Sequence, residues 1–381
     1  MMLHFVQPSK LKTKQIVFED IYAACDSATL EHLKELSSKR RAIEESSNES
    51  RTITEAIARE MYGGFVSRHE QDIHKIEQYL PLLANLFPYA DGISTKNQMA
   101  QWTSALKIRW SSALSSSSFF NFKGPKFFQI DNLRFELGMT LFLYGGILRE
   151  RALEVLSDDL VQSATLFRQA AGIYHHLAHD VLPPLQPELP PEKSPEALAA
   201  VSTIMSLICL AEAQAVTVRK AEEKGTSSSL LAKLHHGVTI FLEEAIGVFH
   251  TVVKQCKDIS SRLLDFISFC KCLHELKGQQ YVAESLKASG QIGAAIGVLG
   301  STLINVKKKI PGEEPWRSIY QKQIHDASEV LRKFVHENDL VWFEKIPSGD
   351  ELPLPEGHKI VNFIPYSPKR WERQLSFKIQ G

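Results

Sequence analysis

Three histidines near the end of a predicted helix have the spacing that most resembles a catalytic motif. His175, His176 and His179 form His-His-x-x-His, and two imidazoles at i and i+4 of a helix can bind one metal ion. A metalloprotease helix carries a glutamate directly after the first histidine as its general base, and this sequence has His176 there. Histidines also favour the negative end of a helix dipole, and Pro183 indicates that the helix ends nearby. We therefore expect a helix end and no bound metal, with a metal-dependent enzyme using the three histidines as the alternative.

The other candidates for chemistry lack part of the pattern that their reaction needs. Cys270 and His274 share one helical face with Cys272 nearby, but no second cysteine pair completes a zinc site. The serine-rich stretch 111–118 lacks the Gly-x-Ser-x-Gly elbow of a serine hydrolase. The glycines of 290–300 lack the Lys-Ser/Thr of a phosphate-binding loop. We expect no catalytic residue and no cofactor.

The composition is that of an ordinary folded protein. The chain has 381 residues, of which 44% are apolar, and its 44 Lys plus Arg balance its 44 Asp plus Glu. A domain that neutralises many phosphates carries a basic excess, so we expect no nucleic-acid partner. Five scattered cysteines favour a reducing compartment over a disulfide framework. Basic runs such as 307–309 leave open a weak contact with an anionic membrane surface.

No segment has the pattern of a secretory signal or a membrane span. The first residues lack the apolar core of a signal peptide. The most apolar stretch, 197–211, is shorter than the about 20 residues that cross a bilayer as a helix. We expect this stretch to be a buried helix.

Hydrophobic periodicity indicates helices along most of the chain. Ser194, Pro195 and Glu196 have the residue types of a helix start, and we expect this helix to run to about Glu223, before Gly225. Other stretches in which apolar residues recur every three or four positions are also expected to be helices: 163–181, 230–252, 265–276, 281–289, 293–307 and 316–338. Residues 281–299 resemble part of one tetratricopeptide unit.

Three regions depart from the helical pattern. Leu3–Val6 and Gln15–Phe18 have the composition of short strands. The prolines of 183–195 cannot continue a helix and predict an extended surface loop. Phe127 and Phe128 are too apolar for a solvated linker, so we expect them to pack on the helical body.

Several short motifs along the chain share their order with one known protein family. They are Glu136 to Ile147, Ser194-Pro195-Glu196, Ala211-Glu212-Ala213-Gln214, Leu231-Ala232-Lys233-Leu234 and Glu337-Asn338-Asp339-Leu340-Val341 to Pro347. Together they resemble the Bro domain, the helical module of Alix, Brox and their yeast and plant relatives, which serve the ESCRT machinery. Leu143 replaces an asparagine that is usual in the family. The resemblance covers nearly the whole chain and is strongest to the Bro-only proteins, especially those of plants.

The resemblance implies a mainly α fold. The expected architecture is a curved, boomerang-like helical array with a tetratricopeptide-like core and a small N-terminal β-sheet. A single Bro-like domain would cover residues 1–381, with N-terminal helices and the sheet in 1–110. A core of helical hairpins would occupy 130–340, and a Pro-rich extended tail in 341–381 would pack back on the core.

The resemblance also implies a non-catalytic adaptor with a partner-binding patch. Family members receive the C-terminal helix of an ESCRT-III subunit on a hydrophobic patch of the concave face. Leu230 and Leu234 match two aliphatic residues of this patch. Thr217 stands where the family has an aromatic residue, and Val161 where it has a lysine. Trp342 replaces a tyrosine that some members present for phosphorylation.

Other roles are compatible with the same residues. The stripe of Leu230 and Leu234 continues through Val238 and Phe241, so a core role is the alternative to an open groove. Another ESCRT subunit is the alternative partner, and a generic helical peptide-binding scaffold is the alternative function. The resemblance implies a cytoplasmic protein that is recruited peripherally to endosomes or multivesicular bodies, where it modulates cargo sorting.

Overall fold

Helices dominate the structure, a computed structural model that describes residues 3–5, 7–49, 67–90, 96–116, 125–347, 352–353 and 356–378. Helix accounts for 70% of the structure and strand for 3%. In chain order the helices are α1 (Ser27–Asn48), α3 (Arg68–Ala84), α4 (Phe87–Ala90), α5 (Lys96–Ala105), α6 (Leu133–Glu154), α7 (Leu160–His176), α8 (Ala199–Glu223), α9 (Ser228–Gln255), α10 (Ser261–Ala288), α11 (Ile292–Lys307) and α12 (Trp316–Glu337).

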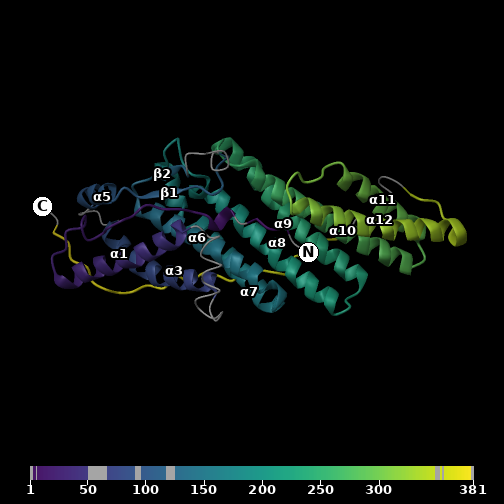
Figure 1. The fold of residues 1–381 in the computed structure, drawn as a ribbon, viewed down its shortest axis with the longest axis horizontal. Helices are drawn as coiled ribbons and strands as arrows, with labels where there is room; N and C mark the ends of the chain where they lie inside the picture. The colour runs from purple at the N-terminus through teal and green to yellow at the C-terminus, as the bar shows by residue number, and fades with distance from the viewer. Residues whose placement is uncertain are drawn as a thin grey trace.

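The helices form an elongated array (Figure 1). From α6 to α12, each helix packs against the one before it, and successive helices run in opposite directions. Most connections are short, but the region 177–198 between α7 and α8 is long. The helices α1, α3 and α5 and the sheet lie at one end of the molecule, and α11 and α12 lie at the other (Figure 1). The mainly helical fold with a small sheet is therefore confirmed.

The small sheet is formed by different residues from those predicted. β1 (Arg109–Ser111) pairs antiparallel with β2 (Phe127–Gln129). The predicted strands at Leu3–Val6 and Gln15–Phe18 are wrong for the described residues there, which belong to no ladder; Val6 itself lies outside the described residues. Phe128 is buried but does not belong to the main apolar cluster, and Lys14 lies over the ring of the half-buried Phe127, so packing of this segment on the helical body stays a prediction.

Side chains, rather than a neighbouring strand, satisfy the backbone of the first residues. Trp316 Nε1 donates to His4 O at 2.9 Å, and Arg149 donates to Phe5 O. Leu3 and Phe5 bury their side chains in the helical core. This segment is threaded between helices, and its apolar composition reflects that burial.

The boundaries of most predicted helices are close to those observed, with three corrections. Residues 265–276 and 281–289 belong to one continuous helix, α10, which runs through the buried Gly278 between them. Ser194 does not cap the next helix: a 3-10 turn (Pro195–Ala197) comes first, and α8 begins at Ala199. The proline region is not fully extended, since Pro183–Glu188 forms a 3-10 helix with Leu185 buried.

The core is one connected cluster of apolar side chains that reaches from Leu3 to Leu375. Its central helix, α8, is 25 residues long and contains an 18-residue stretch with a mean hydropathy of 1.6, so by length and composition alone it is able to cross a membrane. Most of it is buried inside the molecule, and Glu212 in its middle pairs with Arg149 of α6. It is a core helix, longer than the apolar stretch seen in the sequence.

The chain returns along the array after α12. Residues 356–378, which we call the strap, are extended and run back beside α3 toward the end of the molecule that holds α1 (Figure 1). Near its end, Lys378 N donates to Ala23 O at 2.8 Å, and Cys25 N donates to Ser376 O at 2.8 Å. The strap therefore contacts the segment before α1, which is far from it in sequence.

Candidate functional site

The four candidate partner-binding residues come from three adjacent helices. Val161 lies in the first turn of α7, Thr217 in the last turns of α8, and Leu230 and Leu234 in the first turns of α9. Because these helices run in alternating directions, the start of α7, the end of α8 and the start of α9 lie at the same edge of the array. Gln214 Nε2 donates to Leu234 O at 2.8 Å and so joins α8 to α9 there.

The strap shows that the residues on α7 and α8 lie on one face. Arg168 is seven positions after Val161, on the same side of α7, and its carbonyl accepts the N–H of Ile364 at 3.0 Å. Gln214 is three positions before Thr217, on the same side of α8, and its Nε2 also donates to the strap. The strap therefore crosses both helices one or two turns beyond these candidates.

The strap also crosses α9 on the side of the candidate residues, and its close approach to α9 and α7 requires glycine. Gly237 lies three positions after Leu234, and a Cβ atom there would be 2.0 Å from His358 O of the strap. A Cβ atom at Gly172 of α7 would be 1.8 Å from Ile364 O. Both helices carry glycine where the extended backbone lies directly on them.

Exposure separates the two leucines. Leu230 is 42% exposed, whereas Leu234 is only 5% exposed and packs in the core with Val238 and Phe241. The expectation that both leucines line an open groove therefore needs correction for Leu234. The stripe of α9 is wide enough for its centre to be buried by α8 and α10 while its first residue stays at the surface.

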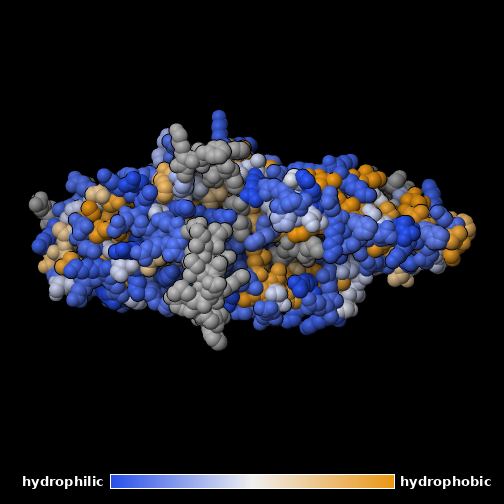
Figure 2. Space-filling model, viewed as in Figure 1, coloured by the Kyte–Doolittle hydropathy of each residue, from blue (hydrophilic) through white to orange (hydrophobic). Residues whose placement is uncertain are grey.

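The accessible part of this face is apolar. Val161 is 52% exposed, Thr217 is half-buried with its hydroxyl donating to Ala213 O, and Ile360 of the strap is exposed. Ile360 N donates to Gln214 Oε1 at 3.0 Å, which places Ile360 one helical turn from Thr217. We call Val161, Thr217, Leu230 and Ile360 the docking face. Figure 2 shows hydrophobic surface over α7 within largely hydrophilic surroundings.

Sequence reasoning missed Ile360, and no local signal was available to find it. Its position depends on where the strap crosses α8, which is set by contacts distant in the chain. The glycines of the crossing are visible in the sequence, but helix interiors contain glycine for several reasons.

The histidine cluster belongs to the junction between α7 and the strap. The His175 ring stacks on His179 and on Phe363 of the strap, with 4.1 Å between ring centroids in each pair. His176 pairs with Asp180 at 2.8 Å. Burial lowers the pKa of His175, which favours its neutral form. The predicted helix end is correct, since a π-helical turn (Leu177–Val181) continues α7 and ends just before Pro183.

These histidines do not form a metal centre in this geometry. Stacked rings place their nitrogen atoms side by side and do not direct them at one point. Among the residues that the structure describes, no group of three His, Cys, Asp or Glu side chains is placed to hold a metal ion. The alternative of a metal-dependent enzyme therefore has no structural support here.

A polar cluster on the other side of α8 was also missed. Glu222 Oε1 accepts the hydroxyl of Tyr281 at 2.7 Å and lies 3.4 Å from His235 Nε2. His235 Nδ1 in turn lies 3.0 Å from His274 Nδ1. His274 was noted in the sequence only as a neighbour of cysteines, because its true partners are supplied by α8 and α9.

The electrostatics of this cluster favour one charged and two neutral groups. Burial alone would raise the pKa of the Glu222 carboxyl, but hydrogen bonds from His235 and Tyr281 and the charge of Lys277 outweigh it and lower the pKa to about 2. Burial lowers the pKa of His235 and His274. At neutral pH the carboxylate is charged and both imidazoles are neutral.

Comparisons with a family model and with curated proteins point to the same family. A family model described as "BRO1-like domain" matches residues 31–378. "Apoptosis-linked gene 2-interacting protein X 1" of Caenorhabditis elegans is 24% identical over 298 residues, which are 75% of this chain and 32% of that protein. "BRO1 domain-containing protein BROX" of Homo sapiens is 24% identical over 254 residues, 63% of this chain and 60% of that protein. The chain spans about a third of the length of the first of these relatives.

Solved structures show the same fold. The structure titled "ALIX BRO1 CHMP4C complex" aligns with a TM-score of 0.69 at 19% identity, over 94% of each chain. The structure titled "Structure basis for endosomal targeting by the Bro1 domain" aligns with a TM-score of 0.65 at 14% identity, over 98% of this chain and 94% of the other.

Proposed function

Because the chain belongs to the BRO1-like domain family, we propose that it is a non-catalytic adaptor that binds the C-terminal helix of an ESCRT-III subunit. A related BRO1 domain of the same fold has been solved as a complex with CHMP4C. By this proposal, residues 1–381 act as a single Bro-like domain, and the docking face receives the helix.

The observation that carries this proposal is the pair of exposed aliphatic side chains on one face, Val161 and Leu230, on either side of Thr217. An amphipathic helix binds through apolar residues spaced one turn apart, and it needs exposed apolar side chains on more than one element opposite it. The docking face offers α7, α9 and the strap, with α8 between them. Leu234 supports this surface from beneath.

The cellular role follows from the proposed partner. An adaptor that binds an ESCRT-III subunit would be cytoplasmic and recruited peripherally to endosomes or multivesicular bodies, where it would modulate cargo sorting. A different ESCRT subunit as main partner is the second candidate, and it would use another surface.

The test measures binding of a fluorescent peptide that comprises an ESCRT-III C-terminal helix. We expect Leu230→Asp to weaken binding at least about tenfold, because a charge would lie against the apolar side of the helix. Val253→Asp is the matched control, since Val253 lies on the same helix, α9, and is 41% exposed. We expect Thr217→Phe, which restores the aromatic residue of the family, to tighten binding.

Two results would contradict the docking face. One is peptide binding that Leu230→Asp and Val253→Asp weaken equally. The other is peptide binding that neither Leu230→Asp nor Thr217→Phe changes. Leu234→Asp is a poor test, because a charge at this buried position would damage the fold itself.

A further inference from the structure

A cavity lies on the side of α8 opposite the docking face. It has a volume of about 70 Å³, is open to solvent and lies among α8, α9, α10 and α12. Thr217 and Arg219 are two positions apart and so point about 200° apart around the helix. The residues lining the cavity are Leu156, Ala215, Val216, Arg219, Glu222, His235, Leu273, His274, Lys277 and Gln323.

Two side chains of this cavity have donor groups without a matching partner in the described part of the chain: the buried amide of Gln323 and the half-buried ammonium of Lys277. Gln323 is only 7% exposed, and its Nε2 has no hydrogen-bond partner. Lys277 Nζ lies 6.0 Å from the centroid of the Tyr281 ring, and the described residues place no carboxylate within 4.0 Å of it. Arg219 directs Nε to Glu223 at 3.2 Å, where both side chains are largely exposed. Buried donors without acceptors are rare in proteins.

The carboxylate that lines the cavity does not satisfy these donors. Glu222 already accepts Tyr281 and lies against His235. Arg219 is already paired with Glu223, so Lys277 is the lining cation for which the described residues place no carboxylate within 4.0 Å. The cavity therefore holds one ammonium group and one buried amide donor that a single anionic group can bridge.

The apolar residues that line the cavity indicate which kind of ligand body it accepts. Leu156, Ala215, Val216 and Leu273 form apolar surface beside the donors. A site of this kind suits a ligand with an anionic head and a short hydrocarbon body. A carboxylate suits Lys277, which has no carboxylate partner within 4.0 Å among the described residues, and its two oxygens can accept from an ammonium and an amide together.

We propose that this cavity binds a short aliphatic carboxylate, with Lys277 and Gln323 holding the carboxylate and Arg219 at the rim. The same chemistry is found in a free short-chain acid and in a glutamate side chain of a bound peptide. The site lies on the other side of α8 from the docking face, so it does not depend on the proposed ESCRT-III partner.

The experiment follows the imidazole signals of His235 and His274 by NMR in the full chain labelled at histidine. Sodium butyrate is the probe for a free acid, and N-acetylglutamate N-methylamide is the probe for a glutamate side chain. Butyramide has the shape of butyrate without its charge. We expect one of the two acids to give saturable shifts of both imidazoles, and butyramide to bind at least about tenfold more weakly. The acid that binds more tightly shows whether the natural carboxylate belongs to a free short-chain acid or to a glutamate side chain.

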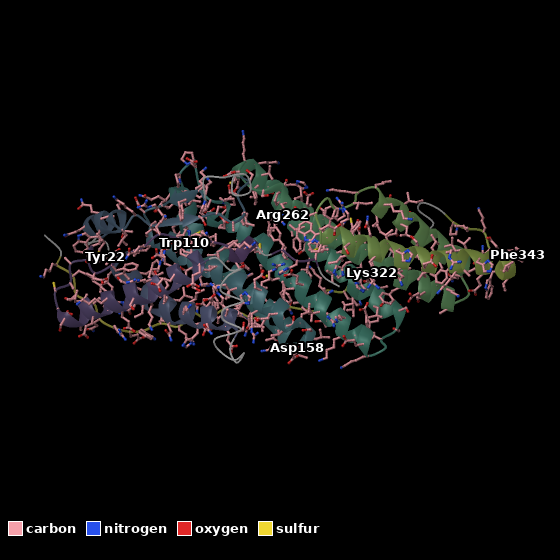
Figure 3. All side chains as sticks on the ribbon, in the orientation of Figure 1. Tyr22, Trp110, Asp158, Arg262, Lys322 and Phe343 are labelled. Carbon is pink, nitrogen blue, oxygen red and sulfur yellow. The ribbon has the colours of Figure 1, made fainter. Side chains whose placement is uncertain are left out.

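Variants locate the site. Lys277→Met should weaken binding about tenfold. Lys322→Met should leave it unchanged, because Lys322, labelled in Figure 3, is exposed on α12 next to Gln323 and does not line the cavity. Gln323→Leu is a second variant that removes a donor without changing the charge, should Lys277→Met fail to fold.

Several results would overturn the proposal. They are the absence of saturable shifts with either acid, butyramide binding as tightly as butyrate, inorganic phosphate binding as tightly as either acid, and Lys277→Met and Lys322→Met having the same effect.

Discussion

Buried charged side chains in this protein are paired with partners distant in sequence. Arg149 of α6 and Glu212 of α8 are both buried and form an ion pair, and Arg40 of α1 pairs with Glu136 of α6 in the same way. Removing one member of such a pair leaves a buried charge without compensation. This lowers the free energy of unfolding more than replacing both members with apolar residues does. These pairs therefore join α6 to α1 and α8, which lie beyond its immediate neighbours α3 and α7.

The partly exposed Glu222 gives a prediction for the pH dependence of stability. Its pKa is about 2 in the folded protein, below the ordinary value of 4.5, so its contribution is present above pH 4.5 and is lost as the pH falls from there toward 2. Wild-type protein should therefore lose about 1 kcal/mol more of its free energy of unfolding between about pH 6 and pH 3 than Glu222→Gln, after allowance for solvent screening. Urea unfolding at both pH values measures this difference.

The control for this prediction is Glu223→Gln. Glu223 is the next residue on α8, and within the described residues its ion pair is with the exposed Arg219. Its removal should leave the pH dependence close to that of wild type. Equal behaviour of the two variants would show that the hydrogen bonds from Tyr281 and His235 do not hold the pKa of Glu222 down.

Single residues also show where prediction from sequence reaches its limit. The i, i+4 spacing of Leu230 and Leu234 places both on one side of a helix, but it does not show how far the neighbouring helices cover that side. The structure exposes Leu230 and buries Leu234. The histidine motif was similarly visible, but its stacking on Phe363 depends on a chain segment almost two hundred residues away.

At the scale of elements, helix interiors were predictable and their junctions were not. The stripes of α7, α9 and α11 follow directly from apolar periodicity, and Gly290, with φ at 78°, ends α10 as expected. The strands were placed wrongly because short apolar segments have the same composition whether they pair in a sheet or thread between helices. The order of family motifs, rather than periodicity, indicated the fold.

The crossing of the strap over α9 gives a prediction at this scale. In Gly237→Ala the new methyl group would meet His358 O, so the strap must move away and lose the hydrogen bond from His358 N to Lys233 O. We expect faster hydrogen exchange in strap peptides that contain His358 and Ile360, and lower stability. Hydrogen exchange followed by mass spectrometry measures the exchange rate of the strap peptides, and urea unfolding measures the stability.

Gly247→Ala is the matched control on the same helix. A Cβ atom at Gly247 has no atom within 4 Å, so alanine there should stabilise α9 by about 0.5–1 kcal/mol through its better helix propensity. If Gly237→Ala and Gly247→Ala change the free energy of unfolding in the same direction, the strap does not lie as closely on α9 as the structure shows.

For the whole molecule, the strap acts as a tie between distant parts of the array. It contacts α7, α8 and α9 near the middle and reaches the helices at one end, where Phe377 packs against Tyr22, Tyr89 and Trp102. A helical array in which each helix touches mainly its neighbours can lose structure from one end while the rest stays folded. A segment that contacts both the end and the middle opposes this.

We therefore expect Phe377→Ala to loosen the end of the molecule selectively. The substitution removes ring contacts from the residues before α1, from α4 and from α5, and it should lower stability there by about 2–3 kcal/mol, because the ring is only partly buried. Amide exchange should become faster in α1 and α5 and stay unchanged in α9 and α10. Trp371→Ala, which removes a more exposed aromatic residue of the same strap, should leave all four helices as protected as in wild type. Uniformly faster exchange in Phe377→Ala would mean that the array unfolds as one unit and that the strap stabilises no particular end. Unchanged exchange would mean that the contacts of Phe377 do not stabilise the end of the molecule.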